Sequence, residues 1–380
     1  MNVRASIKVC VALGAALCVA AAAAHHAIEA KFDYAKRLSL RGIVTGVDWR
    51  NPHAHVFVNV TRDGGAIENW AVELESTVLL RRSGWQHDAL KPGDAIEVNG
   101  PTARDGSRQV WGERVVATAT QRQVYNVVDP GPSVPQAPRP TPRGADGKPL
   151  LGVADGSGGY WAYPTSTVLM QAGANVPMNA DGILARLADA PRVAPFQPWA
   201  LGLYRHRQER HLADDPGYLN CKNPGGVRQF QTPYGVQLIQ DPGRQRIFVL
   251  VGGGNRNYHI IYMDGRSQQG QVQGDDDNPL YYGRGVAHWE GDTLVVSTTG
   301  FNEDFWFTNG GLPHADKLSL VERFSRPDYD TLRYEVTIDD PEYYTRPWTT
   351  AWTYRYSPND ELMEYFCTEN ERDREHMVGK

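Results

Sequence analysis

The sequence contains no block of basic residues, few cysteines, and no long apolar segment after its first 24 residues. The formal net charge is −5, which argues against a nucleic-acid partner. Charged residues make up 22% of the chain and aromatic residues 10%, a balance that excludes a disordered or collagen-like protein. Together these features favour a folded protein that does not bind nucleic acid and has no membrane span once its first segment is removed.

Several common cofactor and catalytic motifs are also missing. The glycine-rich segment 252–255 precedes a strand pattern, so it predicts a hairpin turn and not a phosphate-binding loop. Neither a Gly-x-Ser-x-Gly elbow nor a zinc-binding helix with spaced histidines occurs. The acidic run 275–278 lacks the spaced ligands of a calcium loop. These absences argue against a nucleotide site and against the best-known hydrolase motifs.

Residues 1–24 have the pattern of a signal peptide. Arg4 and Lys8 precede an apolar stretch, and small residues follow up to Ala24. Cleavage after Ala24 would remove two cations and change the net charge from −5 to −7. We therefore expect a periplasmic or secreted protein without a membrane span after cleavage.

Two of the four cysteines leave with this peptide, and Cys221 and Cys367 remain. Two cysteines in an oxidising compartment are expected to form one disulfide. It would close a loop of about 146 residues and, in the chain-entropy model, contribute roughly 4–5 kcal/mol. Metal binding by the pair is less favoured because neither cysteine belongs to a Cys-x-x-Cys motif.

A proline-rich linker at 127–150 divides the chain, with seven prolines and almost no large apolar residues. Before it, residues 25–126 predict a small Greek-key barrel of the oligonucleotide/oligosaccharide-binding type. A helix is expected at 76–82, and turn signals separate the candidate strands. These strands are 40–48, 53–60, 70–74, 95–100 and 110–118.

The second domain, 151–380, begins with a segment, 151–215, whose only clear feature is a possible helix at 179–190. Later strand patterns follow one another with short turns, which favours a larger antiparallel, lipocalin-like (calycin-type) barrel and leaves a β-sandwich as the alternative. The expected strands are 236–240, 246–251, 258–264, 286–290, 293–299, 318–324, 332–338, 349–356 and 362–367. The fold class predicted for the whole chain is all-β.

Several segments resemble uncharacterised families of exported bacterial proteins. His25-His26 with Phe32-Asp33, the segment WRNPH at 49–53 and LKPGD at 90–94 resemble one such family. The segments HWEGDTLVV at 288–296, GFN at 300–302 and ERF at 322–324 resemble a second, secreted group. Neither resemblance implies an established activity. A basic residue is usual in the second group where His259 stands.

Histidines near the start of the chain are candidate metal ligands. In the strand 53–60, alternate residues from Ala54 to Val60 predict a core face, which leaves His53 and His55 on the other face. Cleavage after Ala24 would make His25 the amino terminus, where its amine and its imidazole can both bind a metal. With His26, these residues would form a nitrogen-rich site suited to copper. The alternative is that they are ordinary surface histidines.

The second domain offers a different set of candidates. Glu322 alternates with apolar residues on the strand 318–324, and a buried carboxylate can act as a general acid or base. We expect His314 or His288 as its partner. The predicted binding residues are Tyr262, His259, Trp289, Asn302, Trp348 and Glu364. Structural roles for each of these residues remain the alternative.

Two functional hypotheses follow, together with a third that involves no chemistry. In the first, the larger barrel either binds a small apolar or aromatic molecule or converts it, without a cofactor, as a lyase, isomerase or hydrolase. In the second, the protein is a non-enzymatic copper-binding or metal-handling protein that acts through its amino-terminal histidines. The third is an interaction module for an unidentified partner. The oligomeric state is left open.

Overall fold

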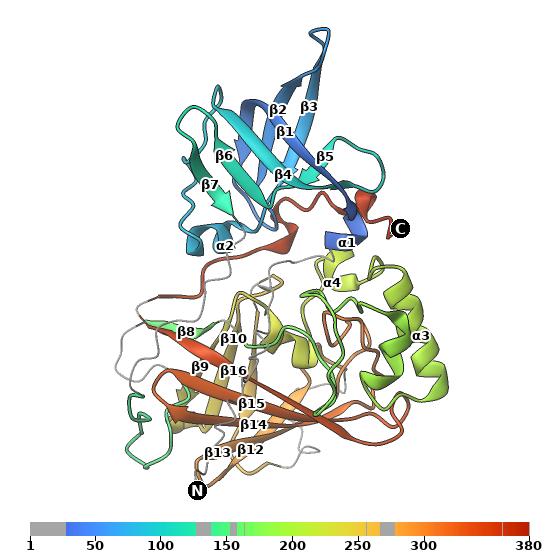
Figure 1. The fold of residues 1–380 in the computed structure, drawn as a ribbon. Helices are drawn as coiled ribbons and strands as arrows, with labels where there is room; N and C mark the ends of the chain where they lie inside the picture. Colours follow the sequence, from blue (N-terminus) through green and yellow to red (C-terminus); the bar gives the residue numbers. More distant parts are fainter. Residues whose placement is uncertain are drawn as a thin grey trace, which may run out of the picture.

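The structure, a computed structural model, describes residues 28–126, 138–152, 158–162, 164–255, 257–266, 278–358 and 360–379. Its strands form two closed barrels of five and nine strands, which confirms the all-β class. Figure 1 shows the smaller barrel above the larger one, with the carboxy-terminal end of the chain between them. The predicted signal peptide and part of the proline-rich linker, 127–137, lie outside the described residues.

The smaller barrel has the strand order β1-β2-β3-β5-β4 and closes because β1 also pairs with β4. β3 and β5 are parallel, and β6 and β7 extend the sheet from β4. This arrangement confirms the predicted small barrel. The strands are β1 Phe32–Asp48, β2 His55–Thr61, β3 Ile67–Glu73, β4 Ala95–Ala103, β5 Gln109–Trp111, β6 Arg114–Ala117 and β7 Arg122–Asn126.

Two short helices accompany this barrel. Helix α1 (Ile28–Lys31) leads directly into β1, and helix α2 (Thr77–Arg82) follows β3 where a helix was expected. Ser76 caps α2 by accepting a hydrogen bond from the Leu79 N–H. The predicted core face of β2 is confirmed, because its alternate side chains pack in the barrel interior, namely Ala54, Val56, Val58 and Val60.

The larger barrel contains strands β8 to β16 in sequence order and closes through the pairing of β16 with β8. All neighbours are antiparallel except β11 and β12. The consecutive order agrees with the predicted barrel, although β8 was not predicted. The strands are β8 Gly159–Ala162, β9 Val236–Asp241, β10 Arg246–Val251, β11 Asn257–Tyr262, β12 Arg284–Glu290, β13 Thr293–Thr299, β14 Ser319–Asp328, β15 Thr331–Asp339 and β16 Trp348–Pro358.

Aromatic side chains fill the interior of the larger barrel. The 3-10 helix η2 (Gly226–Gln231) carries Phe230 into it, and the Phe230 ring centroid lies 4.7 Å from that of Tyr334 and 5.4 Å from that of Phe324. The Phe230 carbonyl accepts hydrogen bonds from Trp352 Nε1 and from the Tyr354 hydroxyl. The 3-10 helix η2 thus packs through Phe230 against aromatic side chains of β14, β15 and β16.

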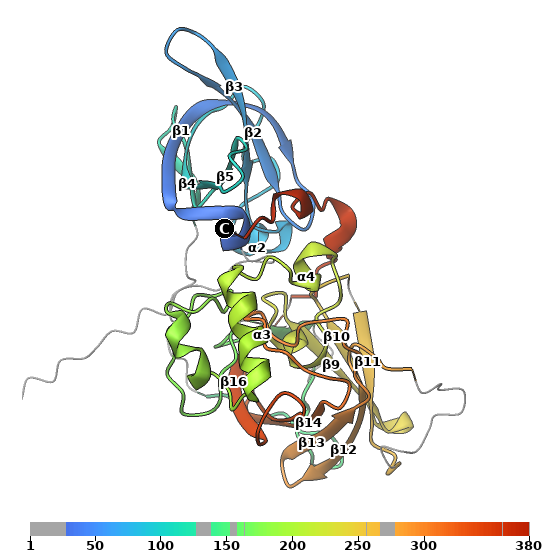
Figure 2. The same ribbon diagram turned by 90° about the vertical axis from the view of Figure 1, so that its right-hand side faces the viewer.

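Helical segments flank the larger barrel on one side (Figure 2). In the described parts of the chain, no helix is both long and apolar enough to cross a bilayer. The flanking segments include η1 Leu187–Arg192 and α3 Pro198–Glu209 (Figure 2), and α4 Pro216–Leu219 follows them in the chain. Of the other 3-10 helices, η3 Pro242–Arg244 connects β9 to β10, and η4 Cys367–Glu369 and η5 Arg374–His376 belong to the carboxy-terminal segment after β16.

The expected helix at 179–190 is wrong except for its last four residues, which belong to the 3-10 helix η1. The Asn179 side chain accepts hydrogen bonds from the backbone N–H groups of Asp181 and Ile183 and thereby holds a turn. Gly182 has a φ of +80° and packs against Gly310, where a β-carbon would lie 2.4 Å from the Gly310 Cα. Tight packing and a left-handed backbone thus replace the helix that the sequence pattern favoured.

The expected strand at 362–367 is also wrong, because this segment leaves the barrel after β16 without pairing to another strand. We call residues 360–379 the C-terminal tail. A disulfide between Cys221 and Cys367 attaches the tail to the larger barrel, as predicted. Beyond Cys367 the tail crosses to the smaller barrel, as both views show.

Candidate metal site between the barrels

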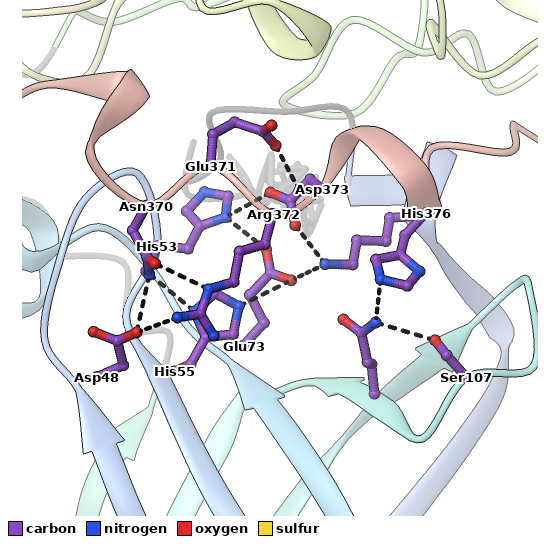
Figure 3. Close-up of polar contacts among 12 residues, drawn as sticks. Asp48, His53, His55, Glu73, Ser107, Asn370, Glu371, Arg372, Asp373 and His376 are labelled. Carbon is purple, nitrogen blue, oxygen red and sulfur yellow. Dashed lines mark hydrogen bonds and ion pairs between the residues drawn. The ribbon is translucent and has the colours of Figure 1, made fainter.

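The tail covers the end of the smaller barrel where β2 begins. His53 lies just before β2 and His55 is its first residue, and the tail leaves them only 1% and 4% exposed. They share the strand face that the sequence predicted, but the tail converts this part of the face into an interface. Figure 3 shows both imidazoles beneath the tail.

The central feature of this interface is a buried cluster of charges. Lys31 Nζ lies 2.5 Å from Glu73 Oε2 and 2.5 Å from Asp373 Oδ1. His53 Nδ1 lies 2.5 Å from the other Glu73 oxygen, Oε1, and 3.5 Å from Asp373 Oδ2. These four residues come from the end of α1, the start of β2, the end of β3 and the tail, and each is at most 3% exposed.

The electrostatics of the cluster follow from its two carboxylates. Burial alone would lower the pKa of His53, but hydrogen bonds and charge from Asp373 and Glu73 raise it to about 10. Burial likewise opposes the charge on Lys31, yet the same two carboxylates raise the pKa of that ammonium above its ordinary value. His55 differs because burial dominates and lowers its pKa.

Two further buried carboxyl groups interact electrostatically with this region. Glu75 follows β3, and burial raises its pKa to about 7. Within the described residues neither of its carboxylate oxygens has a hydrogen bond of normal geometry, and the nearby Ser76 N–H only partly offsets the rise in pKa. Burial also raises the pKa of Asp181 well above its ordinary value, and the charges of Glu29 and Glu75 add to that rise.

Further contacts fix the tail on the smaller barrel on both sides of Asp373. Asp48 accepts hydrogen bonds from Arg372 at 2.7 Å and from Asn370 at 3.2 Å. On the other side, His376 Nδ1 lies 2.5 Å from Asp105 Oδ2, and its Nε2 lies 2.9 Å from the amide nitrogen of Gln109. Asp373 is thus held in place by its neighbours in the tail.

The geometry of the cluster is compatible with a metal ion. One potential ligand atom from each of His53, Glu73 and Asp373 lies within 4.8 Å of the others. One imidazole and two carboxylates are a common donor set for zinc and related divalent ions. Of the four histidines predicted as ligands, only His53 belongs to this group. His55 Nε2 lies 3.8 Å from Glu73 Oε2, and His25 and His26 lie outside the described residues.

Three residues of the cluster were not predicted from the sequence, namely Glu73, Asp373 and Lys31. Glu73 ends β3, which pairs with β2, so the alternation of both strands was a usable signal that Glu73 lies beside His55. For Asp373 there was no local signal, because it approaches Lys31 from 342 residues further along the chain.

The three acid–base candidates of the larger barrel do not come together. Glu322 is buried, and its carboxylate accepts hydrogen bonds from Thr298 at 2.7 Å and from Tyr334 at 2.8 Å. Burial raises its pKa, and these two hydrogen bonds partly offset the rise. His314 is buried among aromatic rings, with Nε2 3.0 Å from the Phe305 carbonyl oxygen, and burial lowers its pKa.

The expectation that His288 points inward is wrong. Its side chain is 64% exposed on the outer face and lies 3.3 Å from Glu290. The alternation of β12 separates two faces correctly, but the residues that face inward are Gly285, Ala287 and Trp289. Gly285 is buried, and Ala287 and Trp289 are partly buried and pack against the barrel core.

The predicted binding residues are also dispersed. Trp348 is a buried core residue, and Trp289 packs against the core. The guanidinium groups of Arg246 and Arg266 lie 5.2 Å and 3.8 Å from the centroid of the Tyr262 ring. His259 is stacked on Tyr282, and burial lowers its pKa to about 3.

The other two predicted binding residues lie outside the strands. Asn302 accepts a hydrogen bond from the Asp304 N–H in a turn, and Glu364 is exposed on the tail. A cavity of about 50 Å³ lies beside the disulfide, lined by residues that include Tyr218, Lys222 and Arg228. It has room for a few water molecules.

Comparison with known proteins identifies a match for one part of the chain. Residues 14–112 match the model of a family of unknown function (DUF6152). The matched range includes Lys31, His53, His55 and Glu73 and ends before the tail that supplies Asp373. No curated protein matches the chain. The amino-terminal part is therefore similar to an uncharacterised family, in agreement with the resemblance noted in its sequence.

Proposed function

We propose that this chain is an exported metal-handling protein that binds one divalent transition-metal ion between its two barrels. The observation that carries this proposal is the convergence of His53, Glu73 and Asp373. Three distant parts of the sequence bring one imidazole and two carboxylates within 4.8 Å in a buried location. Burying charged groups is costly unless they are paired or bind a metal, so such a cluster is a candidate functional site.

The charge balance of the region supports a cation. Four carboxyl groups, those of Glu73, Glu75, Asp181 and Asp373, are at most 6% exposed. The Lys31 ammonium and the His53 imidazolium lie against Glu73 and Asp373, whereas the structure shows no ion pair for Glu75 or Asp181 among the described residues. Burial raises the pKa of both Glu75 and Asp181, and the positive charge of a metal ion bound nearby would oppose that rise.

The amino terminus is a second source of ligands in this proposal. If the signal peptide is cleaved after Ala24, His25 begins the mature chain three residues before Ile28. Cleavage there would give His25 a free amine beside its imidazole, and with the imidazole of His26 these groups are the nitrogen ligands that the sequence predicts. Added nitrogen ligands would favour copper, whereas the described donors alone suit zinc.

The small-molecule hypothesis has less support. The Glu322 carboxylate is already bound by two hydroxyl groups, and the proposed histidine partners lie elsewhere. Phe230 and its aromatic neighbours occupy the centre of the larger barrel. Cofactor-free catalysis by Glu322 would need a ligand to displace this packing.

Metal titration of the mature protein tests the proposal. Protein beginning at His25 would be freed of metal with a chelator and titrated calorimetrically with Zn²⁺ and Cu²⁺, and the stoichiometry would be read by native mass spectrometry. We expect one ion per chain. The substitution Asp373→Asn removes one carboxylate ligand and should weaken binding at least about 100-fold.

The matched control is Glu364→Gln, which alters an exposed carboxylate in the same tail and should leave the affinity unchanged. Failure of the unaltered protein to bind either ion would refute the proposal. Equal affinities for the unaltered protein and the Asp373→Asn variant would move any site away from the barrel junction.

A further inference from the structure

The Lys31 ammonium lies between the two carboxylates that we propose as metal ligands. It is 1% exposed, and its distances to Glu73 Oε2 and Asp373 Oδ1 are both 2.5 Å. A divalent ion bound by the same carboxylates would need its own oxygen contacts at about 2.0–2.2 Å. His53 lies on the side of the other two oxygens, Glu73 Oε1 and Asp373 Oδ2, so a metal ion bound there would share the negative charge of the same two carboxylates with the ammonium and would weaken its ion pairs.

The backbone holds Lys31 in this position independently of the charges. Its carbonyl accepts a hydrogen bond from the Arg104 N–H at 2.8 Å, and the next residue, Phe32, is fully buried in a small apolar cluster. The ammonium lies 5.3 Å from the Phe32 ring centroid, which gives it a second favourable contact. The backbone at the end of α1 is thus fixed, and the flexible Lys31 side chain brings its positive charge to the carboxylate pair.

We propose that Lys31 is a tethered counter-cation that pairs with Glu73 and Asp373 in the metal-free protein and is displaced when a metal ion binds. This inference rests on the proposed function and concerns how the same site is regulated. The lysine keeps the two carboxylates neutralised, so the tail stays attached to the smaller barrel without metal. It also lowers the metal affinity, because each binding event must break two ion pairs. Such competition suits a protein that releases its ion to a recipient.

Substitution of Lys31 provides the direct test. Lys31→Gln removes the charge and keeps a polar side chain, and it should increase the Zn²⁺ affinity of the mature protein at least about tenfold. Lys31→Arg retains the charge and should leave the affinity within about threefold of the original. The control is Lys36→Gln, which changes a lysine on the following strand whose side chain is 73% exposed, and it should have no effect.

A second measurement does not depend on a variant that folds. An amine-acylating reagent, followed by peptide mass spectrometry, would report the reactivity of Lys31 with and without Zn²⁺. We expect its reactivity to rise when Zn²⁺ takes over the carboxylates, while that of Lys36 stays constant.

The possible results separate the two proposals. If the original protein binds Zn²⁺, but Lys31→Gln binds no more tightly and Lys31 reactivity does not rise, the counter-cation role is overturned and the metal site stands. If neither the original protein nor Lys31→Gln binds Zn²⁺ or Cu²⁺, the metal proposal itself fails.

Discussion

Both barrels bury carboxylates, but they neutralise them in different ways. In the larger barrel, Glu322 is bound by hydroxyl groups from the two adjacent strands, at separations of 24 and 12 residues. At the junction, Glu73 and Asp373 face two cations, and Asp373 lies 342 residues from Lys31. The first arrangement needs only sheet pairing that already exists. The second exists only when the tail returns to the smaller barrel, which is why we assign function to the junction.

The largest predicted effect concerns the charge cluster itself. Glu73→Gln would leave two buried cations facing a single carboxylate, so we expect the free energy of unfolding to fall by about 3–5 kcal/mol. Urea denaturation at neutral pH, followed by tryptophan fluorescence, measures this change. A loss below about 1 kcal/mol would show that altering a buried carboxylate costs no more stability at the junction than in the interior of the larger barrel.

Removal of the disulfide tests whether the junction depends on its tether. The double substitution Cys221→Ala and Cys367→Ala removes the covalent attachment of the tail, and we expect a loss of about 2–4 kcal/mol. Limited proteolysis should then cut the tail first, because only non-covalent contacts would hold it: the ion pairs of the cluster and the packing of Tyr365 and Met377. Unchanged cleavage of the tail would indicate that the ion cluster alone holds it.

The raised pKa of Glu75 should make the stability of the protein depend on pH. Burial raises its pKa to about 7 from an ordinary value of 4.5, so the folded state retains a proton that the unfolded chain loses. Its contribution to stability is therefore complete below pH 4.5 and decreases as the pH rises toward 7. Glu75→Gln removes this dependence and should stabilise the protein by about 3 kcal/mol at pH 8 and by little at pH 4.

Chemical denaturation of the original protein and this variant across pH 4–8 would provide the measurement. A constant difference in stability at every pH would mean that Glu75 is ionised normally in the folded protein. In that case the excess of buried acids, which supports a metal ion, would be smaller than we infer.

The smallest effect is expected inside the larger barrel. Glu322→Gln keeps one oxygen acceptor, and the hydroxyl of Thr298 or Tyr334 can rotate to accept from the new amide, so stability should change by less than about 1 kcal/mol. Thermal unfolding by calorimetry measures it. A ligand-dependent activity that disappears in this variant would instead support the small-molecule hypothesis.

Much of the fold could be predicted because it depends on local patterns. The apolar alternation from Ala54 to Val60 identifies the core face of β2, and turn residues separate most strands of the larger barrel. Only Cys221 and Cys367 remain after the predicted leader, so their pairing needed no knowledge of the fold. The candidate site was predicted only in part, since His53 was identified and its two carboxylate partners were not.

The sequence by itself determined which residues share a strand face, where the chain turns and which cysteines pair. Tertiary structure decided which strand face points inward. Side-chain alternation along a strand defines two faces but does not tell which of them is buried, and His288 lies on the outer face of its strand. It also decided the course of the tail, whose residues have no repeating pattern and are ordered by contacts with a distant barrel. The cluster of Lys31, His53, Glu73 and Asp373 depends on that course and therefore exists only in the folded chain.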